Sequence, residues 1–130
     1  MKKVLVLLLV TFMVLLLVAC GGSYRFADAS DHSKMIGHQH VEIVDEFLDG
    51  TISVKQARER LDGLSEIDTD SVGDSTADLI TSTTNMLLRQ ATFSLRISVG
   101  DYAFSGSNDC FDIVIERRNT LAEGLGMSAR

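Results

Sequence analysis

Apolar positions recur with a helical period between residues 31 and 49. This spacing predicts an amphipathic α-helix over the whole stretch. Gly50 follows directly, at the position where glycine commonly ends a helix. The predicted buried face consists of Ile36, His40, Ile43, Val44, Phe47 and Leu48, with Val41 at its edge.

A second, shorter helix is predicted to begin after Ser53. Ser53 and Gln56 have the spacing of a capping box, in which each side chain accepts a hydrogen bond from a backbone amide at the helix start. Because only Thr51 and Ile52 separate this helix from the first, we expect the two to fold back as an antiparallel hairpin. Its narrow apolar stripe consists of Val54, Ala57, Leu61 and Leu64.

The longest periodic run follows Ser71, and its members alternate spacings of four and three residues. It predicts a helix over 72–104, about 50 Å long at ~1.5 Å per residue. Thr, Gln and Gly interrupt the apolar stripe, which favours packing within one small bundle over a long coiled coil. The stripe consists of Val72, Thr76, Leu79, Thr83, Met86, Gln90, Phe93, Ile97, Gly100 and Phe104.

A strand is the alternative for part of this run. Side chains alternate between apolar and polar with period two over 93–99, and the Gly100-Asp101 pair that follows can turn a hairpin. The helix is favoured because its pattern continues on both sides of this window.

The last predicted helix follows a polar loop at 105–109. Gly124 or Gly126 is expected to end it. The connections are short enough for an up-and-down arrangement. The sequence therefore predicts an all-α fold, a small antiparallel bundle of three to four helices over 31–126. The buried face of the last helix is predicted to hold Phe111, Val114, Ile115, Arg118, Leu121 and Leu125.

The first twenty residues have a different pattern. Two lysines follow Met1, and residues 4–19 are apolar apart from Thr11. This stretch spans about 24 Å as a helix, whereas a bilayer core is roughly 30 Å thick. A cationic start, a short apolar stretch and a small residue at its end are typical of a secretory signal peptide.

Leu17-Val18-Ala19-Cys20 ends this segment and resembles the lipobox of bacterial lipoproteins. The resemblance implies cleavage between Ala19 and Cys20, with residues 1–19 as the signal peptide. It also implies a diacylglycerol on the Cys20 thiol, which an acyl chain on the new amino group can join. Two chains anchor a protein stably because each buried methylene contributes about 0.8 kcal/mol. We expect no other cofactor, and a location on the cell membrane facing the extracellular side or the periplasm.

Residues 20–30 follow the predicted cleavage site and have little periodicity. They include Gly21-Gly22 and are expected to form a flexible, lipidated tether. In outline the body is also similar to small helical lipoproteins of bacteria, at Gly50–Ser53 with Ala57 and Leu61 and at Arg118–Ala122. This second likeness implies no catalytic residues.

Charge and cysteine content narrow the possibilities for the mature chain. Loss of residues 1–19 leaves 111 of 130 residues, with 10 basic residues in place of 12 against 18 acidic ones, a net charge of −8. An acidic body disfavours nucleic acid and anionic lipid surfaces. With Cys20 lipidated, Cys110 has no cysteine partner within the chain. We expect it to be a small buried residue, with intermolecular pairing or a reactive thiol as the alternatives.

Three histidines, His32, His38 and His40, lie close together in the first predicted helix. His38 and Glu42 are four residues apart, a spacing that can hold a metal ion on one helical face. His40 points about 200° away from His38 on a helix and belongs to the apolar face, so we expect a core histidine. No metal site is therefore predicted, and His38 with Glu42 is the nearest candidate pair.

The acidic connector at 66–74 contains part of the calcium-binding EF-hand pattern. Asp68, Asp70 and Gly73 match its first, third and sixth positions, but Val72 and Leu79 stand where two ligands are required. A solvated turn before the next helix is the favoured interpretation, because its acidic side chains suit a helix N-terminus.

The sequence contains no spacing typical of a catalytic nucleophile, a phosphate-binding loop or a redox pair. We therefore expect no enzyme. The favoured function is a membrane-anchored binding or interaction module with an unknown protein partner. Two alternatives stay open: a metal- or calcium-binding accessory lipoprotein, and a phage-exclusion or immunity lipoprotein.

Overall fold

The computed structural model describes residues 2–8, 24–70 and 73–130. Residues 2–8 are helical and exposed. The predicted lipobox with Ala19 and Cys20, and the first part of the expected tether at 20–23, lie outside the described residues. None of the helices described is both long and apolar enough to span a bilayer.

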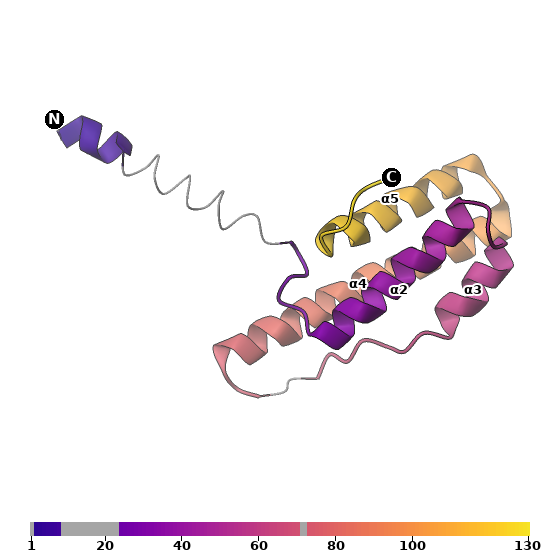
Figure 1. Cartoon of the computed structure of the whole chain (residues 1–130), viewed down its shortest axis with the longest axis horizontal. Helices are drawn as coiled ribbons and strands as arrows, with labels where there is room; N and C mark the ends of the chain where they lie inside the picture. Colours follow the sequence, from indigo (N-terminus) through magenta and orange to yellow (C-terminus); the bar gives the residue numbers. More distant parts are fainter. Residues whose placement is uncertain (1, 9–23, 71–72) are drawn as a thin grey trace.

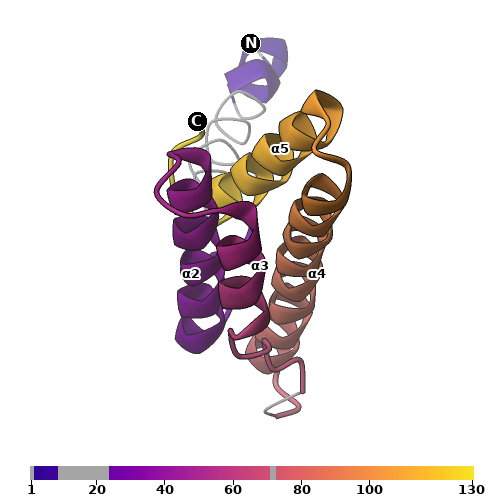
Figure 2. The ribbon, with the colours of Figure 1, turned by 90° about the vertical axis from the view of Figure 1, so that its right-hand side faces the viewer.

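The described part of the body is all-helical, as predicted. It consists of α2 (Asp31–Leu48), α3 (Val54–Asp62), α4 (Thr76–Ser105) and α5 (Asn108–Gly124). The α2–α3 pair folds back as the expected antiparallel hairpin, and α5 returns along the second half of α4 (Figure 1). The helices α2 and α4 each contact the other three. Seen from the side, α2, α3 and α4 lie next to one another and α5 crosses over one end (Figure 2).

Local sequence signals account for the helix boundaries. The capping box before α3 is confirmed, with the Gln56 amide donating to Ser53 Oγ at 3.1 Å and the Ser53 amide donating to Gln56 Oε1 at 2.9 Å. The chain leaves α2 through Gly50, whose φ of 77° is readily adopted only by glycine. Residues 93–99 are helical, so the strand alternative is wrong. The long helix begins at Thr76 with Ser75 as its N-cap, later than predicted.

The predicted buried faces of the first and last helices are confirmed. In α2, Phe47 and Leu48 are half-buried at the end of this face. In α5, Phe111 and Ile115 are half-buried at its edge. The residues of the two predicted faces that are fully buried are Ile36, His40, Val41, Ile43, Val44, Val114, Arg118, Leu121 and Leu125.

The predicted buried stripe of α4 is wrong, because this helix packs through a different face. Leu79, Met86, Phe93 and Ile97 are about half exposed, and Phe104 is 95% exposed. The buried face holds smaller and more polar residues, whose hydroxyl groups donate to carbonyls of the same helix. Thr84, Thr92 and Ser98 each do so, at 2.7–2.9 Å. The buried face of α4 consists of Thr84, Asn85, Leu88, Thr92, Leu95, Ser98 and Val99.

The second half of the expected tether packs against the bundle. Phe26 is fully buried, and its amide donates to the Gly124 carbonyl at the end of α5 at 2.8 Å. A Cβ on Gly124 would come within 2.4 Å of the Phe26 ring, so glycine makes this close approach possible. Ala29 is buried as well, and the Ser30 amide donates to Asn85 Oδ1 of α4 at 3.0 Å. Residues 24–30 are therefore part of the domain.

An ion pair between the buried Arg118 and the half-buried Asp45 connects α5 to α2. The Arg118 side chain is 6% exposed and donates from Nε and Nη2 to the two carboxylate oxygens of Asp45, at 2.8 and 2.9 Å. Its Nη1 donates to the Ser128 carbonyl at 2.6 Å, which fixes the C-terminal segment. Arg130 also pairs with Asp45, at 3.2 Å, and with Asp49. The Arg130 hydrogen bond lowers the pKa of Asp49.

Candidate functional site

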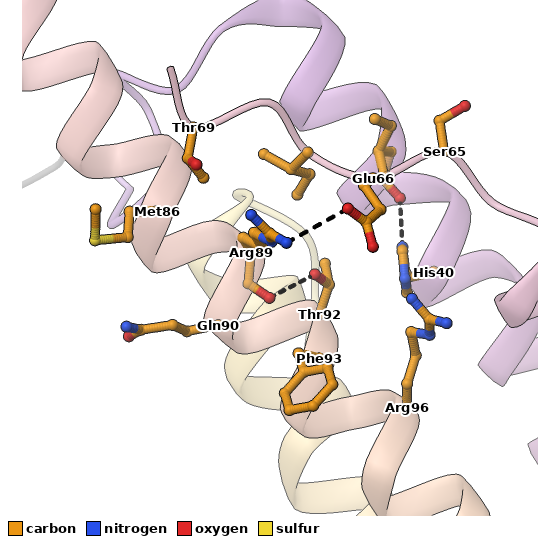
Figure 3. Close-up of a pocket in the computed structure, with 12 residues that line it drawn as sticks. His40, Ser65, Glu66, Thr69, Met86, Arg89, Gln90, Thr92, Phe93 and Arg96 are labelled. Carbon is orange, nitrogen blue, oxygen red and sulfur yellow. Dashed lines mark hydrogen bonds and ion pairs between the residues drawn. The ribbon is translucent and has the colours of Figure 1, made fainter. Parts of the chain in front are cut away.

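A cavity of about 500 Å³ opens between α2, the connector at 65–69 and α4. We call it the His40 pocket. Its walls combine apolar side chains with a few polar groups, a composition typical of sites for small molecules. Figure 3 shows the side chains that line it: Ile36, His40, Ser65, Glu66, Ile67, Thr69, Met86, Arg89, Gln90, Thr92, Phe93 and Arg96.

The connector forms one wall because several contacts hold it against the helices. Ile67 is 3% exposed and anchors the segment in the core. Asn85 Nδ2 donates to the Asp68 carbonyl at 3.3 Å, and Ser82 Oγ donates to the Thr69 carbonyl at 3.1 Å. These two bonds from α4 position the irregular backbone without any secondary structure in the connector itself.

His40 supplies the buried polar group of this pocket. The residue is 2% exposed, and its Nδ1 lies 2.8 Å from the Ile36 carbonyl (Figure 3). Because a carbonyl oxygen only accepts, this contact assigns the hydrogen of the neutral ring to Nδ1. Nε2 is then a bare acceptor, and none of the described residues donates to it. Buried polar atoms are nearly always hydrogen-bonded, so this exception requires an explanation.

Burial is the main reason that the pKa of His40 is lowered, which favours the neutral ring. The hydrogen bond that Nδ1 donates to the Ile36 carbonyl opposes this change, and the nearby Arg96 guanidinium lowers the pKa further. Arg96 is paired with Asp62 at 3.0 Å, and Arg89 with Glu66 at 3.4 Å. Both arginines line the opening and each retains further N–H donors.

The arrangement suits a ligand that is mostly apolar and carries one hydroxyl group. The buried Ile36 and Ile67 and the half-exposed Met86 offer apolar contact. His40 Nε2 is closed to solvent in this structure, so a hydroxyl group can donate to it only after a lining side chain such as Arg96 moves aside. The same hydroxyl group can accept from Arg96, which also lines the pocket. An N–H group could satisfy only the first of these partners, so the pocket favours a hydroxyl.

The structure does not bring the sequence-predicted metal candidates into this pocket. His38 is half-buried and Glu42 is exposed on α2, and neither lines the cavity. Across the residues that the structure describes, no group of three side chains could hold a metal ion together.

The predicted calcium loop is only partly described, since Val72 lies outside the described residues. The Asp70 amide donates to Asp68 Oδ1 at 2.9 Å, which closes a local turn. The backbone carbonyls of Asp68 and Thr69 already accept from α4.

Cys110 is half-buried in the first turn of α5, where the sequence predicted a buried residue. Its amide donates to Ser107 Oγ at 3.2 Å, as part of the helix cap.

Sequence reasoning placed His40 in the core and missed the pocket around it. The histidine is the one ionisable member of the predicted apolar face of the first helix, and this was the available signal. The other walls come from the connector and from the exposed side of α4, whose contributions depend on tertiary packing. Phe93 and Met86 were expected inside the bundle, whereas they stand at the pocket opening.

The fold and pocket define a small all-α protein with a cavity of ligand size next to an exposed apolar helix face. No family model matches the chain, and neither does any curated protein or solved structure.

Proposed function

We propose that this protein is a lipid-anchored, non-enzymatic binding module on the outer side of the cell membrane. In this proposal the His40 pocket holds a small, mostly apolar ligand with a hydroxyl group. The observation that carries the binding function is the buried Nε2 atom of His40, which has no donor among the described residues. An unpaired buried acceptor costs about 1–3 kcal/mol, and a ligand hydroxyl would remove that cost.

The other polar groups of the pocket support binding without catalysis. The Thr92 hydroxyl donates to the Arg89 carbonyl at 2.9 Å, so it is not activated by the imidazole. Glu66 is held by Arg89. Among the described residues, the one hydrogen bond of the His40 side chain is to the Ile36 carbonyl and none is to a hydroxyl group, and its neutral ring can serve as an acceptor.

The anchor rests on the lipobox at 17–20 and is tested by mass and location. We expect the mature protein to begin at Cys20, to carry a diacylglycerol and to fractionate with the membrane. Cys20→Ser removes the acylated thiol, so this variant should lose the lipid mass and leave the membrane fraction or remain as an uncleaved precursor. Membrane retention of a cleaved, unmodified Cys20→Ser chain would refute the anchor.

A matched pair of probes tests the pocket. Para-cresol and para-xylene have nearly the same shape, and only the first carries a hydroxyl group. One additional buried hydrogen bond contributes about 1 kcal/mol, so para-cresol should bind about fivefold more tightly to the purified protein. Ring resonances of His40 in NMR spectra report binding at the site itself.

The control variant is His40→Phe, which keeps an aromatic ring and removes the acceptor. It should bind both probes equally, at the weaker affinity. Equal affinity of the unmodified protein for the two probes, or a preference for para-cresol that survives His40→Phe, would refute the role of Nε2.

A further inference from the structure

The exposed apolar residues of α4 form a continuous stripe along the bundle. They keep the alternating spacing of four and three residues from Leu79 to Phe104, a length of about 38 Å at ~1.5 Å per residue. In Figure 2, α4 lies at the edge of the bundle next to α3, and Arg58 and Asp62 of α3 border the exposed apolar residues between Phe93 and Gly100. We call this surface the outer stripe. It consists of Leu79, Thr83, Met86, Gln90, Phe93, Ile97, Gly100 and Phe104.

We propose that the outer stripe pairs with the same stripe of a second copy of the chain, in antiparallel orientation. This inference goes beyond the proposed function and does not require a ligand in the pocket. Met86, Gln90 and Phe93 belong both to the stripe and to the pocket lining, so a second copy would cover the pocket opening. A spacing of four and three is the pattern by which two helices interlock their side chains in a coiled coil.

The stripe is self-complementary about its own centre. A two-fold axis between Ala91 and Thr92 sets Leu79 opposite Phe104 of the second copy and Met86 opposite Ile97 of the second copy. Each of these two pairings occurs twice in the dimer, which gives four layers with an apolar side chain from each copy. All four residue types are at least 48% exposed in the single chain, so the pairing covers side chains that water otherwise surrounds.

The remaining layers fit the same register. Thr83 lies opposite Gly100 of the second copy. In this layer a small side chain therefore faces a residue that has no side chain. A Cβ at Gly100 would meet no atom within 4 Å, so this position is open to a neighbouring helix. Gln90 lies opposite Phe93 of the second copy at the centre. Polar residues at such positions lower stability and fix the register of a coiled coil.

The charge distribution also favours this face for contact between two copies. The whole chain has 18 acidic and 12 basic residues, yet residues 79–104, the span of the outer stripe, contain a single acidic residue, Asp101. The basic residues of this span are Arg89 and Arg96, which pair with Glu66 and Asp62 of the same chain. The surface that would meet the second copy is therefore close to neutral, whereas an acidic surface would repel its own copy.

Disulfide cross-linking in membranes of cells that express the full chain tests the pairing. All variants carry Cys110→Ser. The Cys110→Ser chain without an added cysteine gives the blank level of cross-linking. Chains with Leu79→Cys and chains with Phe104→Cys, tagged differently and expressed together, should form a mixed dimer. Each alone should not, because identical positions lie roughly 38 Å apart in this register.

Two controls separate the pairing from chance collision. Ile113 of α5 is 43% exposed outside the stripe, so Leu79→Cys with Ile113→Cys should give only the blank level. Phe93→Glu with Ile97→Glu would bury charge in the dimer and should reduce the mixed product about tenfold or more. Ile113→Glu should leave it unchanged, and circular dichroism of each purified variant verifies its helix content.

Three outcomes would overturn the proposal. Equal cross-linking of the Ile113→Cys control would show random collision. Strong cross-linking of Phe104→Cys with itself would show a parallel pairing. Absence of the mixed product in variants that keep their helix content would show that the stripe does not pair.

Discussion

The buried pair of Arg118 and Asp45 allows a prediction in which two substitutions at one contact differ in cost. Asp45→Asn keeps the shape of the acceptor and removes its charge. The Arg118 guanidinium, 6% exposed, is then left without a carboxylate at its Nε and Nη2 groups. Removing one partner of a buried pair costs about 3–5 kcal/mol. Because Arg118 Nη1 keeps its hydrogen bond to the Ser128 carbonyl, we expect Asp45→Asn to lower the free energy of unfolding by about 3 kcal/mol, the lower end of this range.

The reverse substitution, Arg118→Met, should cost less. Asp45 is 26% exposed and retains Arg130 at 3.2 Å, so its carboxylate keeps both water and a cation. Methionine fills much of the volume of the arginine stem. The loss is then mainly that of hydrogen bonds, about 1–2 kcal/mol. The doubly substituted protein should lose about as much as Arg118→Met alone, since no buried charge is left unpaired.

Urea unfolding followed by circular dichroism measures these differences. At an m-value of about 2 kcal/mol/M, the midpoint should fall by roughly 1.5 M for Asp45→Asn and by about 0.5–1 M for Arg118→Met. A larger loss for Arg118→Met than for Asp45→Asn would contradict the assignment of the cost to an unpaired buried guanidinium. Simple additivity in the double variant would contradict it as well.

Further predictions concern glycines, pH and a helix cap. Gly100→Ala should stabilise the protein by about 0.5–1 kcal/mol, because the added Cβ meets open space within α4. Gly124→Ala should destabilise the protein by about 1–3 kcal/mol, because the added Cβ collides with the Phe26 ring. Thermal unfolding of both variants measures the difference. Burial lowers the pKa of His40 in the folded state, so below about pH 6.5 the unfolded chain binds the proton more readily and stability falls. His40→Leu should flatten this part of a pH series of urea midpoints. Ser53→Ala removes one half of the capping box before α3 and should cost about 1 kcal/mol in the same assay.

Local signals were sufficient for α2 and α3. Each has a single apolar face and a Ser N-cap, and glycine follows each helix within two residues. A helix with a single apolar face can turn only that face toward the core. The fold class and the α2–α3 hairpin therefore follow from the residues alone. The position of His40 in the core follows for the same reason.

The packing of α4 could not be predicted in this way, because α4 has two stripes that compete for burial. The outer stripe contains the larger side chains, including Phe93 and Phe104, and therefore looks like the core side. The inner stripe is preferred because its threonines and serine satisfy their hydroxyl groups within the helix. Gly37 of α2 also permits close contact with this stripe, because a Cβ at that position would lie 3.3 Å from the Leu88 side chain of α4.

The pocket and the packed segment at 24–30 depend on contacts between distant parts of the chain. Phe26 has no periodic neighbours, and its burial requires the space above Gly124, which exists only after α5 has docked. The connector likewise has one buried residue, Ile67, and its position follows from hydrogen bonds to α4. Periodicity identifies elements, and it contains no information on such partners.

The packed segment at 24–30 also limits how the proposed anchor and the proposed dimer combine. Only Gly21, Gly22 and Ser23 separate Cys20 from this segment, and the four steps from Cys20 to Tyr24 span at most about 14 Å. A two-fold axis through the centre of the outer stripe is perpendicular to α4. Both anchors of an antiparallel dimer reach one membrane only if that axis stands along the membrane normal, which places α4 parallel to the membrane. A parallel dimer has its axis along α4 and requires this helix to stand upright, so the orientation of α4 and the cross-linking register must agree.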